Sequence, residues 1–405
     1  MKYIIPRAIF GNRGDLGSRW GVLAALKDMG VENVIVFRKY PEDVPNFSFT
    51  SLPYGKARNL VLPQVFWKYF RKTNVILWAV GLDLQDDSSL AKLFYLWVVF
   101  TLYRLAGMKI YCLFQGAGPL KTRPGRWLAA RALSQVSLFI ARDPGTYSLI
   151  GDISPGTKKI LAHDAIFLPG FEQEAAGITV EERQLVDEYI GDKASGPVVG
   201  INIRQWFHLT SRILPYQLNQ AAYKNQSQEK MDQLIHSMVD LIRRIRKDFN
   251  ARILLISAYQ PDVVPWEDDL PWLEQLAEHF KEDDGVILTD KPLTMPQYYA
   301  LMSRLDVMIG MRLHSSLIAL RMGVPSLNIS YTLKGRDILE YMGLGKNVVD
   351  LNEFLKDPSI AHNRFCEVMA NLDTERLEVN RHIQKSIMEN MDIFSTFMKN
   401  IGSSL

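Results

Sequence analysis

Short apolar runs alternate with helix-like stretches along most of this chain, and this alternation constrains its fold more than any other feature. In the first half the apolar runs are Tyr3 to Phe10, Asn33 to Phe37, Val75 to Val80 and Ile110 to Phe114. Strands separated by helices predict a parallel sheet with helices on both faces. The alternation restarts at Val198 and continues to Met342. We therefore predict an α/β fold of two Rossmann-like domains that face each other across a cleft.

The boundary between the two predicted domains lies where this periodicity weakens, between Gly170 and Pro197. A chain of 405 residues exceeds the ~250 to 300 residues at which one core stops growing. We expect an N-terminal domain over 1–180, a C-terminal domain over 197–360 and a helical tail over 361–405. The tail is expected to cross back to the first domain. Strand ends and helix N-termini would then surround the shared cleft.

Composition limits the partners that this chain can have. Its 47 Lys and Arg residues are scattered among 44 Asp and Glu residues, which argues against a nucleic-acid partner and is compatible with small anionic substrates. Cys112 and Cys366 form no CxxC pair, so we expect no zinc site, no disulfide and a reducing, cytoplasmic setting. We also expect no other metal and no cofactor. The segment from Met1 to Arg7 lacks the apolar length of a signal peptide.

The most apolar run, Leu93 to Tyr103, is bracketed by Lys92 and Arg104. It is too short to cross a bilayer, which takes ~20 residues. We expect a buried helix packed against a sheet. The alternative is a peripheral contact with the inner face of the cell membrane.

The segment from Met311 to Ser316 is the strongest candidate for a functional site. It follows an apolar run and precedes a helix-like stretch, so the positive end of a helix would face the loop. Arg312 offers a bidentate fork for phosphate or carboxylate, and His314 can deliver a proton near neutral pH. Ser315 is expected to contact the same anion. The alternative is that Arg312 pairs with an acidic residue while His314 and the serines cap the helix.

Two further cations of the second half are candidates for the same anion. Arg204 ends the strand that starts at Val198, where it can meet Arg312 on the cleft floor. Two converging arginines repel each other unless an anion lies between them, so the substrate is expected to supply that charge. The alternative is a protein partner such as Asp262 or Asp306. Lys334 is either another ligand of the anion or a solvated surface charge.

The first half places polar residues after its strands. Gly11 to Gly17 is predicted to be a turn that lets backbone approach a ligand, with Asn12 and Gly14 as contacts. It matches neither GxGxxG nor a phosphate-binding loop with its lysine. Asp15 is a candidate base or sugar-hydroxyl acceptor, and the alternative is that Asp15 or Ser18 caps the next helix. Asp83 and Gln115 follow later strands, where Asp83 is a second candidate base and Gln115 belongs to a flexible turn.

Several of these motifs together resemble the polysaccharide pyruvyl transferase family over most of the chain. The motifs are Gly11-Asn12-Arg13-Gly14-Asp15, Gly81-Leu82-Asp83, Gln115-Gly116-Ala117-Gly118-Pro119, Ala141-Arg142-Asp143, His163-Asp164-Ala165, Ile309 to Ser315 and Gly323-Val324-Pro325. The resemblance implies a GT-B-like architecture, with Arg204, Arg312 and His314 handling phosphoenolpyruvate. It places the acceptor sugar in the first domain, near Asp15. Here Leu16-Gly17-Ser18-Arg19 follows Asp15, where relatives more often have acidic, small and apolar residues.

The resemblance implies transfer of a pyruvyl ketal from phosphoenolpyruvate to sugar hydroxyls during synthesis of bacterial-type cell-surface polysaccharide. His314 would protonate the methylene carbon, the two arginines would hold the anion, and Asp15 or Asp83 would accept the hydroxyl proton. One alternative is a GT-B-type glycosyltransferase with a nucleotide-sugar donor, because fold does not fix function. Another is a carbohydrate-binding subunit without catalysis. The acceptor is a saccharide, and a free glycan, a lipid-linked unit and a nucleotide sugar all stay open.

Overall fold

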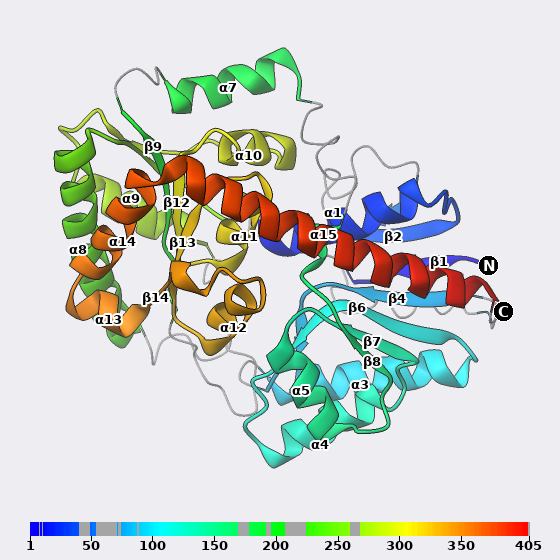
Figure 1. Ribbon diagram of the computed structural model, residues 1–405. Coiled ribbons are helices and arrows are strands. Elements are labelled where there is room, and N and C mark those ends of the chain that lie inside the picture. The colour runs from blue at the N-terminus through cyan, green and yellow to red at the C-terminus, as the bar shows by residue number, and fades with distance from the viewer. Residues whose placement is uncertain are drawn as a thin grey trace.

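The computed structural model describes residues 1–7, 9, 11–39, 49–53, 71, 74–86, 89–168, 178–191, 196–206, 224–259 and 268–403. Within these ranges the strands form two parallel sheets, one from each half of the chain, as Figure 1 shows. The predicted pair of α/β domains is confirmed. The domain limits 1–180, 197–360 and 361–405 stay a prediction. Helix α7 (Val180–Ile190) packs on the second domain, where Gln297 donates a hydrogen bond to the Glu182 carbonyl.

The first sheet has the order β3-β2-β1-β4-β6-β7-β8, and β5 pairs with β6. Its strands are β1 (Tyr3–Ile5), β2 (Val34–Arg38), β3 (Thr50–Pro53), β4 (Val75–Ala79), β5 (Leu82–Leu84), β6 (Lys109–Ala117), β7 (Leu138–Ala141) and β8 (Lys159–Leu161). Strand β4 is buried along its whole length, as expected for a parallel strand covered on both faces.

Successive side chains of the first sheet pack into different cores, because they point to opposite faces. Tyr3 and Ile5 join the core beneath α1 (Arg13–Asp28) and α15 (Leu372–Ser403). Ile4 joins the core beneath α3 (Leu90–Leu105), α4 (Arg123–Leu133) and α5 (Pro144–Ile153). The short helix η2 (Ala165–Phe167) follows β8 and lies against α1.

The second sheet has the order β11-β10-β9-β12-β13-β14. Its strands are β9 (Val198–Asn202), β10 (Arg252–Leu255), β11 (Val286–Leu288), β12 (Val307–Gly310), β13 (Ser326–Ser330) and β14 (Val348–Asp350). Its helices are α8 (Lys224–Phe249), α9 (Leu270–Glu278), α10 (Met295–Met302), α11 (Leu313–Arg321), α12 (Leu333–Tyr341), η6 (Gly345–Asn347), α13 (Leu351–Lys356) and α14 (Ser359–Ala370). In α8, Leu234, Met238, Leu241 and Ile245 bury one face at helical spacing.

Helix α15 connects the two domains. Figure 1 shows it, in red, running from the second domain across to the first. Near its end, Phe397 packs edge-on against Tyr111 of β6, with ring centroids 5.2 Å apart, and Phe394 lies 6.1 Å from Phe114. The predicted return of the C-terminal helix to the first domain is therefore confirmed.

Two sequence expectations need correction in the first domain. The predicted strand from Tyr3 to Phe10 ends at Ile5, and Phe10 lies outside the described residues. The predicted turn over Gly11 to Gly17 is mostly helix, because α1 already begins at Arg13. Neither Asp15 nor Ser18 is the capping residue. The side chain of Asn12 accepts hydrogen bonds from the first turn of α1.

The apolar run Leu93 to Tyr103 forms most of α3, whose inner side is buried in the first domain. No described helix combines the length and the hydrophobicity needed to cross a membrane.

Candidate active site between the two domains

A cavity of about 760 Å³ lies between the domains and is lined by residues of both. Four helices begin at its wall, because each follows a parallel strand that ends there. The lining includes first-turn residues of α1, α5, α11 and α12, represented by Gly14, Gly145, His314 and Gly335. The positive ends of four helix dipoles therefore converge on one space, which favours an anion.

The four helix starts differ in how they are capped. Asn12, Asp143 and Thr332 accept hydrogen bonds from the first turns of α1, α5 and α12. Helix α11 has Arg312 at this position, and its side chain makes no capping hydrogen bond. The N-terminus of α11 is thus the one of these four where a ligand meets first-turn N–H groups without a competing side-chain cap.

The side chains around the cavity carry an excess of positive charge. Seven Lys or Arg residues line it, against three aspartates. Of these cations, Arg142 is buried in the wall and Arg7 is half-buried there. Among the described residues, Arg7 Nη1 and Arg142 Nε have no hydrogen-bond acceptor. Buried donors without acceptors are costly, so an anionic ligand in this cavity is the natural partner for them.

Arg312 is buried at the floor of the cavity and is held by Asp269, which no sequence motif indicated. Its Nε donates to Asp269 Oδ2 at 2.7 Å, and its Nη2 contacts the other carboxylate oxygen. Its guanidinium also lies 4.2 Å from the centre of the Tyr259 ring. Burial alone would lower the pKa of Arg312, but the Asp269 carboxylate outweighs this effect and raises the pKa above its usual value.

The alternative that Arg312 pairs with an acidic residue is therefore confirmed, although the partner is Asp269. Of the partners considered from the sequence, Asp262 lies outside the described residues, and Asp306 accepts hydrogen bonds from Val198 and Arg376.

Arg204 and Lys334 reach the same cavity from the second domain. Arg204 Nη1 donates to the Tyr331 hydroxyl at 2.6 Å, and its guanidinium lies 5.4 Å from the Tyr331 ring. Lys334 Nζ donates to the Ala117 carbonyl of β6 at 2.8 Å, so this cation also connects the domains.

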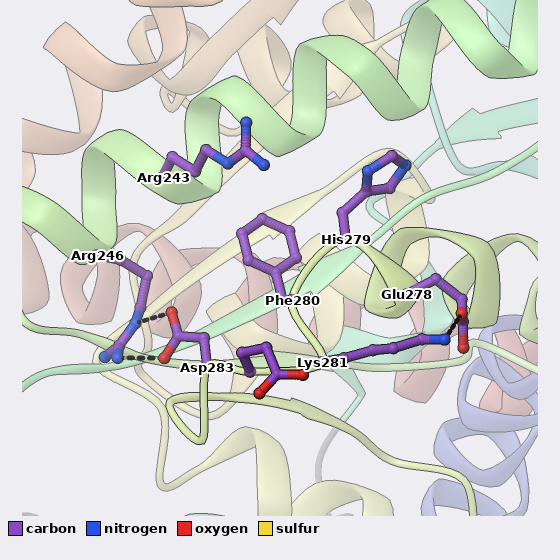
Figure 2. Close-up of a pocket in the computed structure, with 8 residues that line it drawn as sticks. Arg243, Arg246, Glu278, His279, Phe280, Lys281 and Asp283 are labelled. Atoms are coloured by element: carbon purple, nitrogen blue, oxygen red, sulfur yellow. Dashed lines mark hydrogen bonds and ion pairs between the residues drawn. The ribbon is translucent and has the colours of Figure 1, made fainter.

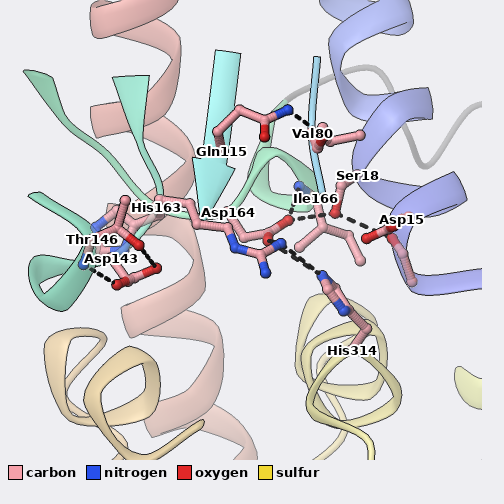
Figure 3. A network of polar contacts seen from close by, with 12 residues as sticks. Asp15, Ser18, Val80, Gln115, Asp143, Thr146, His163, Asp164, Ile166 and His314 are labelled. Atoms are coloured by element: carbon pink, nitrogen blue, oxygen red, sulfur yellow. Dashed lines mark hydrogen bonds and ion pairs between the residues drawn. The ribbon is translucent and has the colours of Figure 1, made fainter. Parts of the chain in front are cut away.

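His314 belongs to a polar network that spans the domain interface. Figure 3 shows Asp164 between Ser18 of α1 and His314 of α11. Asp164 Oδ2 lies 3.3 Å from His314 Nε2 and accepts from Arg142 Nη1 at 3.0 Å, while Oδ1 accepts from the Ser18 hydroxyl at 2.5 Å. Burial alone would raise the pKa of Asp164, but His314 and Arg142 hold the pKa of this carboxyl well below its usual range. Asp164 is thus a buried, ionised anchor for His314.

Close packing fixes the histidine from its other side. A Cβ atom at Gly14 would lie 2.3 Å from His314 Cβ, a distance that folded proteins do not tolerate. Gly14 thus allows the N-termini of α1 and α11 to pack against each other. Ser315 follows in the same turn, and its hydroxyl lies 3.3 Å from the hydroxyl of Tyr298.

The two candidate bases of the first domain differ in their surroundings. Asp15 lines the cavity and accepts from Arg7 at 3.3 Å. Asp83 is not part of the lining and is held by Arg7 at 2.9 Å and Lys92 at 3.1 Å. Burial alone would raise the pKa of Asp83, but these two cations hold it well below its usual range. Asp83 therefore holds Arg7 in place from a position outside the cavity lining.

Of the ten predicted site residues, the cavity brings eight together. These are Asn12, Gly14, Asp15, Arg204, Arg312, His314, Ser315 and Lys334. Gln115 is the other residue outside the lining. Its amide donates to the Trp78 and Val80 carbonyls, so it holds two strand ends of the first sheet together.

Asp269 and Arg7 are site residues that were not predicted from the sequence. Asp269 precedes α9 as a capping residue would, yet its carboxylate makes no cap and turns to Arg312 instead. Nothing in the local sequence separates it from an ordinary helix cap. Arg7 follows β1, and its place after a buried strand was the available signal.

A second hollow lies on the outside of the second domain, between α8 and the end of α9. Figure 2 shows Arg246 bound to Asp283 there, and Lys281 bound to Glu278. These opposite charges already satisfy one another, so this hollow lacks the charge excess of the cavity between the domains.

Comparison with known proteins finds one family that matches most of the chain. The family described as polysaccharide pyruvyl transferase matches residues 12–332. No curated protein matches the sequence.

The UDP-GlcNAc 2-epimerase of Neisseria meningitidis, solved with UDP-GlcNAc, is 11% identical, with a TM-score of 0.59 over 98% of this chain and 100% of that chain. A Rickettsia africae glycosyltransferase is 10% identical, with a TM-score of 0.60 over 99% and 98%. An Anabaena protein solved with UDP-glucose is 11% identical, with a TM-score of 0.58 over 98% and 100%. These similarities confirm the GT-B-like arrangement and, at such identities, only the fold.

Proposed function

Because the chain belongs to the polysaccharide pyruvyl transferase family, an enzyme family that modifies polysaccharides, we propose that it transfers a pyruvyl group from phosphoenolpyruvate to a saccharide. One observation carries the choice of donor. Four helix N-termini and seven cationic side chains face one cavity, next to a histidine anchored by a buried aspartate. Phosphoenolpyruvate has a phosphate and a carboxylate a few atoms apart and needs a proton at its methylene carbon, so its chemistry matches this combination.

Different cations bind different anionic groups of the donor. Arg204 and the N-terminus of α11 bind one anionic group, and Arg142 offers its free Nε to the other. Arg312 is committed to Asp269, so it acts mainly through its fixed position under Tyr259 and its positive charge. The acceptor saccharide lies on the side of the first domain, next to Asp15.

The proposed reaction is balanced by the groups in the cavity. His314 donates a proton to the methylene carbon, and the positive centre that forms at the adjacent carbon is attacked by a first sugar hydroxyl, whose proton passes to Asp15. The carbon–oxygen bond to phosphate then breaks, and phosphate takes the electron pair. A second hydroxyl closes the ketal and releases its proton to the departing phosphate. The Asp164 carboxylate compensates the charge of the protonated ring before transfer.

A second candidate function is glycosyl transfer from a nucleotide sugar. The structural neighbours favour it, since they include a glycosyltransferase and proteins solved with UDP sugars. The family match to pyruvyl transferases opposes it, and the fold alone does not decide between the two.

Substitution of His314 tests the proposed chemistry. Phosphate release from phosphoenolpyruvate is measured with and without saccharide acceptors, and mass spectrometry of the acceptor detects the ketal. His314→Gln is expected to lower turnover by about 10²- to 10⁴-fold, the usual contribution of a general acid, while donor affinity changes by less than about threefold.

His279→Gln is the matched control, because His279 is exposed at the end of α9, outside the cavity. Wild-type turnover in His314→Gln would contradict the assignment of the acid. Transfer of a sugar from a nucleotide sugar, with no ketal formed, would favour the second candidate.

A further inference from the structure

The first domain contains a long stretch without acidic residues. Between Asp87 and Asp143 the sequence has eight Lys or Arg residues and no Asp or Glu. The rest of the chain then holds 39 of the 47 basic residues against all 44 acidic ones, so the positive excess of the protein comes from this stretch. It includes both α3 and α4, which lie side by side on one face of the first sheet.

Aromatic side chains lie exposed among these cations. Phe94 of α3 and Trp127 of α4 are 53% and 50% exposed, unusually high values for side chains of this size. Trp97 joins them, with its ring centroid 5.9 Å from that of Phe94 and 5.4 Å from that of Trp127. The guanidinium of Arg131 lies 5.4 Å from the Trp127 ring. We call this surface the α3–α4 face; it comprises Phe94, Trp97, Arg123, Arg126, Trp127 and Arg131.

The core of the domain does not account for the α3–α4 face. Leu93, Leu96 and Phe100 already bury the inner side of α3 against the sheet. The outer side keeps its aromatic rings at the surface, where Arg123 and Arg126 are also exposed. Aromatic rings that stand among cations match the boundary of a membrane, where rings enter the headgroup layer and cations meet anionic lipids.

The α3–α4 face also adjoins the cavity between the domains. Lys92, in the first turn of α3, and Lys121, just before α4, both line that cavity. Asp86 joins the two helix starts, since its carboxylate accepts from the backbone N–H groups of Lys121 and Thr122. A saccharide attached to a membrane lipid at this face would have a short path to the cavity.

We propose that the α3–α4 face docks on a membrane surface that contains anionic lipids, and that the acceptor saccharide is lipid-linked. The docking rests on the surface itself, whereas the role of the lipid-linked acceptor rests on the proposed function. Docking of this kind is interfacial, with the rings in the headgroup layer and α3 lying in the plane of the surface.

Vesicle flotation tests the docking without any donor or acceptor. Wild-type protein is mixed with vesicles of phosphatidylcholine, with or without phosphatidylglycerol, at low and high salt. Binding is expected to rise at least about tenfold with the anionic lipid and to fall with salt. Phe94→Ser combined with Trp127→Ser, and Arg123→Glu combined with Arg126→Glu, are each expected to lower vesicle binding at least about tenfold.

Leu377→Ser combined with Met388→Ser is the matched control, because these side chains are also strongly exposed but lie on α15, outside the α3–α4 face. It should bind vesicles like the wild type. Equal binding to both lipid mixtures, or wild-type binding by the aromatic variant, would overturn the proposal. So would light scattering that shows the aromatic variant to dissociate a wild-type oligomer, because the face would then bind a second copy.

Phosphate release with a water-soluble saccharide separates this proposal from the proposed function. The aromatic variant should retain wild-type turnover with that acceptor. Loss of vesicle binding with intact turnover supports docking, whereas absence of pyruvyl transfer in the wild type with intact vesicle binding would overturn the function and leave the docking standing.

Discussion

At the scale of single residues, Asp164 organises the site more than any of the ten predicted site residues does. Its carboxylate is 1% exposed and contacts Ser18, Arg142 and His314. Ser18 and Arg142 belong to the first domain, and His314 to the second. One buried negative charge therefore positions Arg142 as a proposed ligand of the donor, His314 as the proposed acid, and the start of α1. Removing a partner from such a cluster leaves uncompensated charge in the interior.

Asp164 predicts a specific dependence of stability on pH. Its pKa in the folded protein lies below the ordinary value of ~3.9 for the unfolded chain. The stabilisation is therefore complete above that ordinary value and is lost as the pH falls toward the folded pKa. Asp164→Asn should lower the free energy of unfolding by about 3 to 5 kcal/mol at pH 7. It should also weaken the acid dependence below about pH 4, measured by urea unfolding at several pH values.

The exposed pair of Asp240 and Arg244 supplies the comparison. Asp240→Asn should change stability by less than about 1 kcal/mol, because exposed ion pairs contribute little. If Asp164→Asn loses stability in acid as steeply as the wild type, Asp164 is not the buried charge described here.

At the scale of elements, the start of α1 shows how packing overrides local sequence. Gly14 and Gly17 are poor helix formers, each about 1 kcal/mol worse than alanine, so a turn was the natural prediction. The structure makes them helical because they give room to His314 and to the Tyr299 hydroxyl, which would lie 2.5 Å from a Cβ at Gly17. The period of the strands and the longer helices was predictable. The start of α1 was not predictable, because His314 and Tyr299, which require glycine there, lie about 300 residues away in the sequence.

Gly14→Ala tests this explanation. Helix propensity alone predicts a more stable protein with unchanged activity. The contact with His314 predicts that the new methyl group displaces the ring, and a displacement near 1 Å lowers turnover by about a hundredfold.

Gly156→Ala is the control for this measurement, because no atom lies within 4 Å of a Cβ at that position. Steady-state turnover and thermal unfolding of both variants distinguish the two explanations. A Gly14→Ala protein with wild-type turnover would mean that His314 has room to move or no role in catalysis.

At the scale of the whole molecule, two domains predicted from alternation enclose one cationic cavity, and α15 crosses from one domain to the other. The fold and eight cavity residues were predictable, because parallel strands deliver their following residues to one edge. The partners of those residues were not. Asp269 reaches Arg312 from 43 residues away, and Asp164 reaches His314 from 150. Such pairings depend on how the two domains meet, and no local pattern encodes that.

Donor binding is the most direct test of the central claim. Phosphoenolpyruvate and UDP-GlcNAc are titrated separately into the wild-type protein and Arg204→Gln by calorimetry. Arg204 is the informative position, since its hydrogen bond goes to the Tyr331 hydroxyl, and its loss leaves no buried carboxylate unpaired as Arg312→Ala would. We predict that phosphoenolpyruvate binds the wild type one to one and binds the variant at least about tenfold more weakly, and that UDP-GlcNAc does not bind. Binding of UDP-GlcNAc without binding of phosphoenolpyruvate would contradict pyruvyl transfer.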